Sequence, residues 1–182
     1  MKFFPIIAFF FSFTQGWAQE ETDKIFWEKD GITWENFEAQ PDENSSFHAN
    51  TSAGLSYSWG LTNGNGVIEL EYEVKSYFNK QGSWVKSGSK NEYLLKHEQV
   101  HFDITELHAR KLRKKLSEIN LNSLGKEPRE VLNNYYKVIE KERGLMQQKY
   151  DRETNHSLNK NAQLKWQEYV ERELSNYEDT AV

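Results

Sequence analysis

The stretch His97–His101 reads HEQVH and sets two histidines four residues apart around a glutamate. On an α-helix, residues with this spacing project from the same face, so the two imidazoles can bind one metal ion. Glu98 follows the first histidine and lies one step round the helix, where it can accept a proton from an attacking water and pass it to a leaving amine. The motif therefore predicts a zinc site with Glu98 as its catalytic base.

A helical wheel predicts that the histidines of this segment face inward. His97, His101 and His108 fall within about 40° of one another at 100° per residue. They lie in the middle of an apolar stripe formed by Leu94, Val100, Ile104 and Leu112. Burying an unpaired polar group costs about 1–3 kcal/mol, so inward histidines need partners. The opposite arc of the helix holds Asp103, Glu106, Arg110 and Lys114. This arc and the basic cluster Arg110–Lys115 are predicted to face solvent.

A catalytic zinc site usually has three protein ligands, so a third must come from elsewhere. His108 lies about 10 Å further along the helix and is expected to be a hydrogen-bonded core residue. If the next helix returns antiparallel, the segment YDRETNH at 150–156 comes level with the motif. This segment offers three candidates for the third ligand, of which His156 is favoured. Asp151 is the alternative ligand or an acceptor for an imidazole N–H, and Glu153 is the remaining candidate.

The sequence leaves the roles of Tyr150 and His48 open. Tyr150 could polarise a substrate carbonyl, but a core aromatic of the second helix is the favoured interpretation. His48 precedes the predicted hairpin in a polar loop, and the sequence assigns it no role.

The elements that must position these residues fall into a strand-rich part, 25–88, and a helical part, 89–178. The alternation in VIELEYEV predicts a half-buried strand, and TNGNG at 62–66 predicts a turn that joins strands 53–61 and 67–78 in a hairpin. Helices are expected at about 89–119, 129–152 and 160–175, the first with Ser89 and Glu92 as a capping box. The predicted fold class is α+β, a zincin-like domain over 19–182 with a small antiparallel sheet followed by a helical half.

The N-terminus predicts export from the cytoplasm. Residues 1–18 combine Lys2, an apolar run and the small residues Gly16 and Ala18, which is the layout of a cleaved signal peptide. The run is too short to span a bilayer stably, so no stable membrane insertion is expected. The protein is therefore predicted to be secreted or periplasmic.

Composition narrows the chemistry further. The chain has no cysteine, which excludes disulfides and a thiol nucleophile and leaves histidine and carboxylate as metal ligands. The formal net charge of −5 and the lack of a basic stripe argue against nucleic acid as a partner.

Several separated motifs are similar to those of a bacterial family of unknown function whose members are predicted to be secreted zinc-dependent proteases. The shared pattern is HEQxHF, then YDxxTxH, then a glutamine three residues before a tryptophan. It falls here on His97–Phe102, Tyr150–His156, Gln163 and Trp166. The resemblance implies zinc held by His97, His101 and His156, with Glu98 as base. A glycine often follows the last histidine in that family, whereas this chain has Ser157.

These observations lead to one expected function and two alternatives. The expected function is a secreted zinc metallopeptidase that cleaves peptide or protein substrates, with an extended substrate adding to an edge strand. The first alternative is a non-catalytic secreted module whose metal site is structural or vestigial. The second is a metal-dependent amidase acting on cell-wall peptides, which would use the same ligands.

Overall fold

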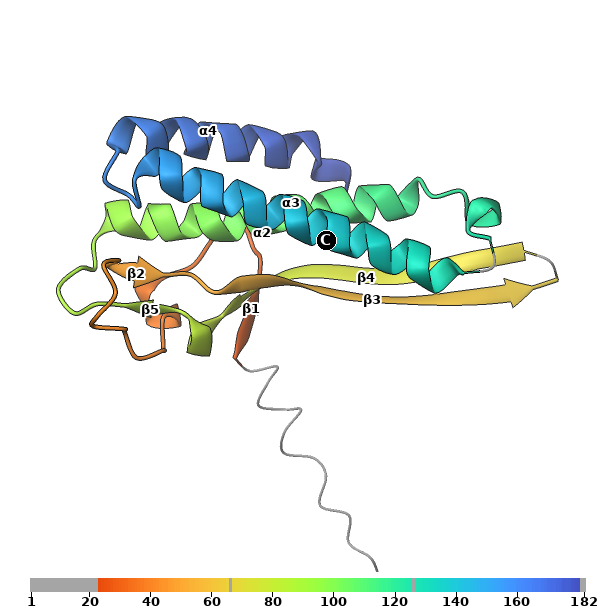
Figure 1. The fold of residues 1–182 in the computed structure, drawn as a ribbon, viewed down its shortest axis with the longest axis horizontal. Coiled ribbons are helices and arrows are strands. Elements are labelled where there is room, and N and C mark those ends of the chain that lie inside the picture. The colour runs from red at the N-terminus through yellow and green to blue at the C-terminus, as the bar shows by residue number, and fades with distance from the viewer. Residues whose placement is uncertain (1–22, 66, 126, 181–182) are drawn as a thin grey trace, which may run out of the picture.

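A computed structural model describes residues 23–65, 67–125 and 127–180, so the expected signal peptide lies outside the described residues. Over these residues the fold is α+β, as predicted, with two small antiparallel sheets and three α-helices (Figure 1). The strands are β1 (Lys24–Phe26), β2 (Ala49–Asn50), β3 (Ala53–Gly64), β4 (Val67–Asn79) and β5 (Trp84–Val85), and the helices are α2 (Glu92–Ser117), α3 (Pro128–Thr154) and α4 (Lys160–Asn176). Short 3₁₀ turns span Trp34–Asn36, Lys80–Gly82, Leu121–Ser123 and Glu178–Thr180.

The long β3–β4 hairpin confirms the prediction from strand alternation. Its register runs without interruption from Ala53 opposite Phe78 to Gly64 opposite Val67, and β1 pairs with the other edge of β4. Along β4 the apolar residues of the alternating pattern turn toward the helices, and Val74 is fully buried. The hairpin thereby supplies the apolar surface on which α2 packs.

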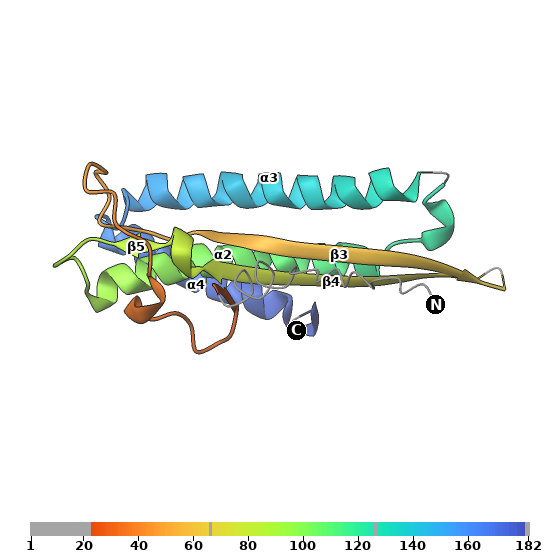
Figure 2. The same cartoon turned by 90° about the horizontal axis from the view of Figure 1, so that it is seen from below.

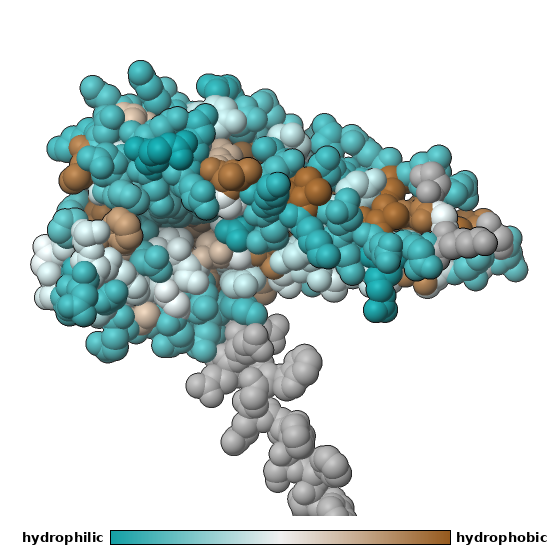
Figure 3. Space-filling model, in the orientation of Figure 1, coloured by the Kyte–Doolittle hydropathy of each residue, from teal (hydrophilic) through white to brown (hydrophobic). Residues whose placement is uncertain are grey.

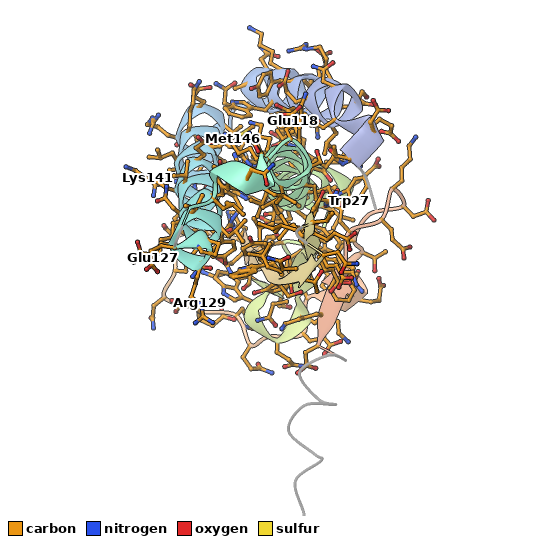
Figure 4. The ribbon with its side chains drawn as sticks, turned by 90° about the vertical axis from the view of Figure 1, so that its right-hand side faces the viewer. Trp27, Glu118, Glu127, Arg129, Lys141 and Met146 are labelled. Atoms are coloured by element: carbon orange, nitrogen blue, oxygen red, sulfur yellow. The ribbon has the colours of Figure 1, made fainter. Side chains whose placement is uncertain are left out.

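The helix that carries the HEQVH motif is enclosed on most of its sides. Figure 4 looks along the helices and shows α2 between α3, α4 and the strands, while Figure 2 shows α3 running along the β3 side of the hairpin. The N-cap of α2 is Asn91, whose side chain accepts a hydrogen bond from the backbone N–H of Leu94 at 2.9 Å. The predicted cap at Ser89 was therefore wrong by two residues, because the backbone of Asn91 is still extended and the first helical residue is Glu92.

The prediction that the charged arc of this helix faces solvent holds for Lys114 and Lys115, which are exposed, but was wrong for its middle part. Glu106, Arg110 and Arg113 are all buried, because β4 and the C-terminal part of α4 cover this side. Glu106 accepts hydrogen bonds from Arg110 Nε at 2.9 Å, Arg113 Nη2 at 3.0 Å and Ser76 Oγ at 2.6 Å. The arc was too polar to suggest a core, but paired charges with every polar atom bonded can be buried.

The Glu106 cluster also fastens the C-terminal end of the described chain. Arg110 Nη1 donates to the carbonyl oxygen of Leu174 at 2.8 Å, and Arg113 Nη1 donates to the carbonyl oxygen of Thr180. Burial lowers the pKa of Arg113, and its ion pair with Glu106 partly compensates. The cluster therefore joins β4, α2 and the end of α4.

His108 is a core residue, as predicted. It is 2% exposed, and its Nδ1 lies 2.7 Å from the carbonyl oxygen of Ile104, to which it donates. Burial lowers the pKa of His108 to about 4, against a usual value near 6.5. The imidazole of His108 is therefore neutral in the native state at neutral pH.

This shifted pKa predicts a loss of stability in acid that depends on His108. Between about pH 6.5 and 4 the unfolded chain binds a proton at His108 that the native chain does not, so the free energy of unfolding falls as pH falls. From pH 7 to 4.5 we expect His108→Leu to lose about 2 kcal/mol less than the unchanged protein. Urea unfolding of both proteins at the two pH values measures this difference. Asp103, whose pKa burial raises to about 6, acts in the opposite direction but is common to both proteins. Equal losses in the two proteins would contradict the assignment.

The surface is mainly hydrophilic in the view of Figure 3, with hydrophobic residues gathered mostly over the hairpin and the first half of α3. Among the described residues, no helix has both the length and the apolar character needed to cross a membrane.

Candidate metal centre

The antiparallel packing of α2 and α3 brings Asp151 opposite the HEQVH turn, as helix lengths predicted. Asp151 Oδ1 lies 3.0 Å from His101 Nε2 and 3.5 Å from His97 Nε2. One ligand atom from each of these three residues lies within 4.8 Å of the other two. The side chains of His97 and His101 are almost buried, while Asp151 is partly exposed.

These distances fit a zinc ion. Bonds of about 2.0–2.2 Å to nitrogen and oxygen place two ligand atoms of a tetrahedral site about 3.3–3.5 Å apart. The two separations to Asp151 lie close to this value. Two imidazoles and one carboxylate are also a donor set that suits zinc and leaves a coordination position open. The described residues therefore contain three side chains that could together hold a zinc ion.

His101 is oriented by a glutamine that the sequence did not single out. Gln147 lies one helical turn before Asp151 on α3, and its Oε1 is 2.5 Å from His101 Nδ1. Its Nε2 donates to the backbone carbonyl of His101 at 2.7 Å, which identifies Oε1 as the acceptor from Nδ1–H. In the neutral imidazole, Nε2 of His101 is therefore the nitrogen that can bind a metal ion. The only signal in the sequence was the i−4 spacing from Asp151.

His97 is held by stacking against the core. The ring of Tyr150 stacks on His97 with centroids 4.7 Å apart and an angle of 24° between the planes. Tyr150 is fully buried and donates its hydroxyl to the backbone carbonyl of His97 at 3.2 Å. The core interpretation of Tyr150 is confirmed, and burial raises its pKa, which keeps the phenol protonated. His97 Nδ1 is buried and has no hydrogen-bond partner among the described residues.

The convergence of these groups shapes their protonation. Burial alone would lower the pKa of His101, but its hydrogen bond with Asp151 and the charges of Glu98 and Asp151 outweigh burial and raise it. Burial alone would raise the pKa of Asp151, yet the hydrogen bonds from His101 and His97 hold it well below its usual range. The carboxylate is therefore ionised.

Glu98 lies beside the ligand group in a pocket of about 430 Å³. Its side chain is 3% exposed, and Oε2 accepts a hydrogen bond from Thr51 Oγ1 at 2.7 Å. The pocket is lined by the three ligand candidates together with the segment Ser46–Thr51 and the bend at 155–158. Thr51 was missed by the sequence analysis, because nothing local marks a residue 47 positions away as the partner of Glu98.

His156 lies at the rim of this group, on an unusual bend. Its Nδ1 is 3.6 Å from Asp151 Oδ1, but the group with mutually close ligand atoms is formed by His97, His101 and Asp151. The side chain is 46% exposed and packs on the ring of Phe47, with centroids 4.4 Å apart.

Three consecutive residues other than glycine form this bend in the left-handed region. Asn155, His156 and Ser157 have φ values of 48°, 49° and 71°. Each such residue costs about 1 kcal/mol, so the surroundings must hold the bend. The N–H of His156 donates to the carbonyl of Asp151 at 2.9 Å, and Tyr93 Oη donates to the carbonyl of Ser157 at 2.6 Å. A glycine would adopt the conformation of Ser157 without strain.

Two other residues considered in the sequence take different places. His48 lines the pocket, and its Nδ1 lies 3.2 Å from Ser89 Oγ. Glu153 turns away from the ligand group and accepts a hydrogen bond from Trp166 Nε1 at 2.9 Å.

Comparison with known proteins adds a family but no activity. No curated protein and no solved structure shows significant similarity to the chain. The model of a bacterial protein family of unknown function, DUF922, matches residues 29–157, which include the HEQVH turn, Asp151 and His156. With most of its length matched, the chain belongs to the DUF922 family of bacterial proteins.

Proposed function

We propose that this protein is an exported zinc-dependent hydrolase that cleaves peptide bonds. The observation that carries the proposal is the convergence of two imidazoles, one carboxylate and Glu98 on a single pocket. Zinc-dependent hydrolysis requires three protein ligands for the ion and a base beside them. The buried Glu98 directly follows the candidate ligand His97 on the same helix.

In this proposal His97, His101 and Asp151 hold the ion. Zinc bound there would acidify a water molecule and polarise the scissile carbonyl. Glu98 accepts a proton from the attacking water and delivers it to the leaving amine. Thr51 orients the carboxylate through its hydrogen bond to Oε2, which leaves Oε1 for the proton transfer.

The pocket wall suggests how an extended peptide would bind. Strand β2 pairs with β5 in a two-stranded sheet, and the N–H of Lys86 donates to the carbonyl of His48. In an antiparallel pair, the backbone groups of successive residues point alternately toward the partner strand and away from it. Because His48 is bonded to the partner strand, the N–H and C=O of Ala49 point away from β5. Because Ala49 lines the pocket, a substrate strand could add along this edge of β2.

A second candidate, a structural metal site, is favoured by one observation. His156 Nδ1 lies 3.6 Å from Asp151 Oδ1, near the separation expected of two ligands of one ion. If His156 joined the other three residues, the site would have four protein ligands and no open position, as in structural zinc sites.

Metal analysis of Asp151→Ala and His156→Ala distinguishes these arrangements. We expect Asp151→Ala to lower zinc affinity at least about 100-fold, because it removes a member of the three-ligand group. His156→Ala should keep stoichiometric zinc after dialysis, and it should still hydrolyse a broad peptide library in a chelator-sensitive manner. If His156→Ala loses zinc while Asp151→Ala keeps it, the ligand assignment is wrong. If unaltered protein binds zinc but cleaves no peptide, the structural interpretation is preferred.

A further inference from the structure

Helix α4 contributes no member of the ligand group, yet its buried side chains lie behind His97. Trp166 packs edge-on against Tyr150 with centroids 5.4 Å apart, and Tyr150 stacks on His97. Gln163, one turn before Trp166 on α4, is 1% exposed. A fully buried glutamine at this place needs a partner for each end of its amide.

Only half of that requirement is met among the described residues. Gln163 Nε2 donates to the backbone carbonyl of Tyr93 at 3.1 Å, but Gln163 Oε1 has no partner. Within the described ranges, three buried side-chain atoms lack a partner, namely Tyr57 Oη, His97 Nδ1 and Gln163 Oε1. The last two are complementary, since a neutral imidazole can donate from Nδ1 and an amide oxygen accepts.

The two unpaired atoms, one on α2 and one on α4, are linked to the same turn of α2. Gln163 is anchored on the carbonyl of Tyr93, and His97 follows Tyr93 by one helical turn. Side chains of a helix lean toward its N-terminus, so the ring of His97 overlies the turn that begins at Tyr93. Burying both atoms without a partner destabilises the fold, and a single hydrogen bond between them would remove this cost.

We propose that Gln163 positions His97 for metal binding, with its Oε1 accepting the Nδ1–H proton directly or through one water molecule. This bond selects the tautomer in which Nε2 of His97 is the nitrogen that can bind a metal ion. Gln147 does the same for His101, so each imidazole is oriented by one glutamine oxygen, from α3 and from α4. Gln163 is a positioning residue in this scheme, and its role as described rests on the proposed zinc site. It lies outside the residues that the family model matches.

The experiment compares three variants of the full-length protein. Gln163→Leu removes both ends of the amide, whereas Gln163→Glu keeps an acceptor and loses the donor to Tyr93. Gln167→Leu is the matched control, because Gln167 lies one turn further along α4 and lines a second pocket, which lies on the Glu106 side of α2 and contains none of the proposed ligands. Zinc affinity is measured by competition with a chromophoric chelator, and stability of the metal-free protein by urea unfolding.

We expect Gln163→Leu to weaken zinc binding about 10- to 100-fold, with Gln167→Leu unchanged. Gln163→Glu should bind zinc like the unaltered protein, although its metal-free form is less stable because the carbonyl of Tyr93 has lost its donor. A purely structural role would instead lower zinc affinity in both Gln163 variants in proportion to their loss of stability. That result, or unchanged affinity in Gln163→Leu, would overturn the proposal.

A second readout separates this inference from the proposed function. In the metal-free protein, nitrogen-15 spectra of the imidazoles should show His97 protonated at Nδ1, and this signal should change in Gln163→Leu but not in Gln167→Leu. If the unaltered protein fails to bind zinc while this pattern is found, the proposed function is wrong and the hydrogen bond stands. If zinc binds and the signal of His97 is the same in Gln163→Leu, the hydrogen bond is refuted and the metal site stands.

Discussion

Replacing Glu98 with glutamine is expected to lower kcat for peptide hydrolysis about 1000-fold while zinc remains bound. Glutamine has nearly the size of glutamate, and its Oε1 can still accept the hydrogen bond that Thr51 donates. It cannot accept the proton of the attacking water, so the loss should fall on kcat rather than on KM. Glu98 is not a member of the ligand group, which is why zinc content should not change.

The matched control is Glu92→Gln, the same change on the same helix at an exposed position. It should leave both hydrolysis and zinc content unaltered. Measurement requires kcat and KM on one peptide identified from a library, with zinc quantified in the same samples. If Glu98→Gln hydrolyses the peptide as well as unaltered protein does, Glu98 is not the base. If this variant loses zinc as well, the glutamate supports the site rather than the reaction.

Removing Glu106 is expected to have the largest effect on stability. Glu106→Ala leaves two buried guanidinium groups, Arg110 and Arg113, without their shared carboxylate. Breaking a buried ion pair from one side costs about 3–5 kcal/mol, because the remaining charge is desolvated. Arg110 would keep only its ion pair with the exposed Glu178. The carbonyls of Leu174 and Thr180 would keep their donors only if the arginines stayed in place, so α4 should loosen as well.

Urea unfolding tests this expectation with two companions. Glu106→Gln keeps hydrogen-bond acceptance without the charge and should fall between the alanine variant and the unaltered protein. Glu142 is an exposed glutamate on α3, so Glu142→Ala should leave the midpoint of urea unfolding nearly unchanged. Equal midpoints for Glu106→Ala and Glu142→Ala would show that the cluster does not stabilise the fold. Because α4 supports His97 through Trp166 and Tyr150, a looser α4 should also weaken zinc binding.

The two faces of α2 therefore have different tasks. One face carries His97, Glu98 and His101 into the pocket, and the other carries the Glu106 cluster that binds the sheet and the C-terminal residues. Mutations on the second face should act on the site only through stability or through α4. Pairing each site variant with a stability measurement keeps the two kinds of effect apart.

Local sequence patterns were sufficient to predict the hairpin and the spacing of several site residues. The period of the strand residues and the TNGNG turn were sufficient to predict the hairpin, because alternation and turn propensity act over a few residues. The HEQVH spacing placed two imidazoles and Glu98 on adjoining positions of one helix, and helix length alone brought Asp151 level with them. These are consequences of helix geometry, which is the same in every fold.

Only the tertiary structure decided which polar groups meet. Asp151 and His156 were both plausible from the sequence, and the left-handed bend at Asn155–Ser157 leaves the imidazole at the rim while the carboxylate lies in the group. Gln147, Thr51 and Gln163 come from three separate segments. No local pattern marks Gln147 or Thr51, and the glutamine–tryptophan pattern that includes Gln163 does not say which residue this glutamine contacts. The arc around Glu106 has the composition of a solvent-exposed face. It is buried because α4 and β4 cover it, and burial of a charge depends on partners that long-range packing alone can supply.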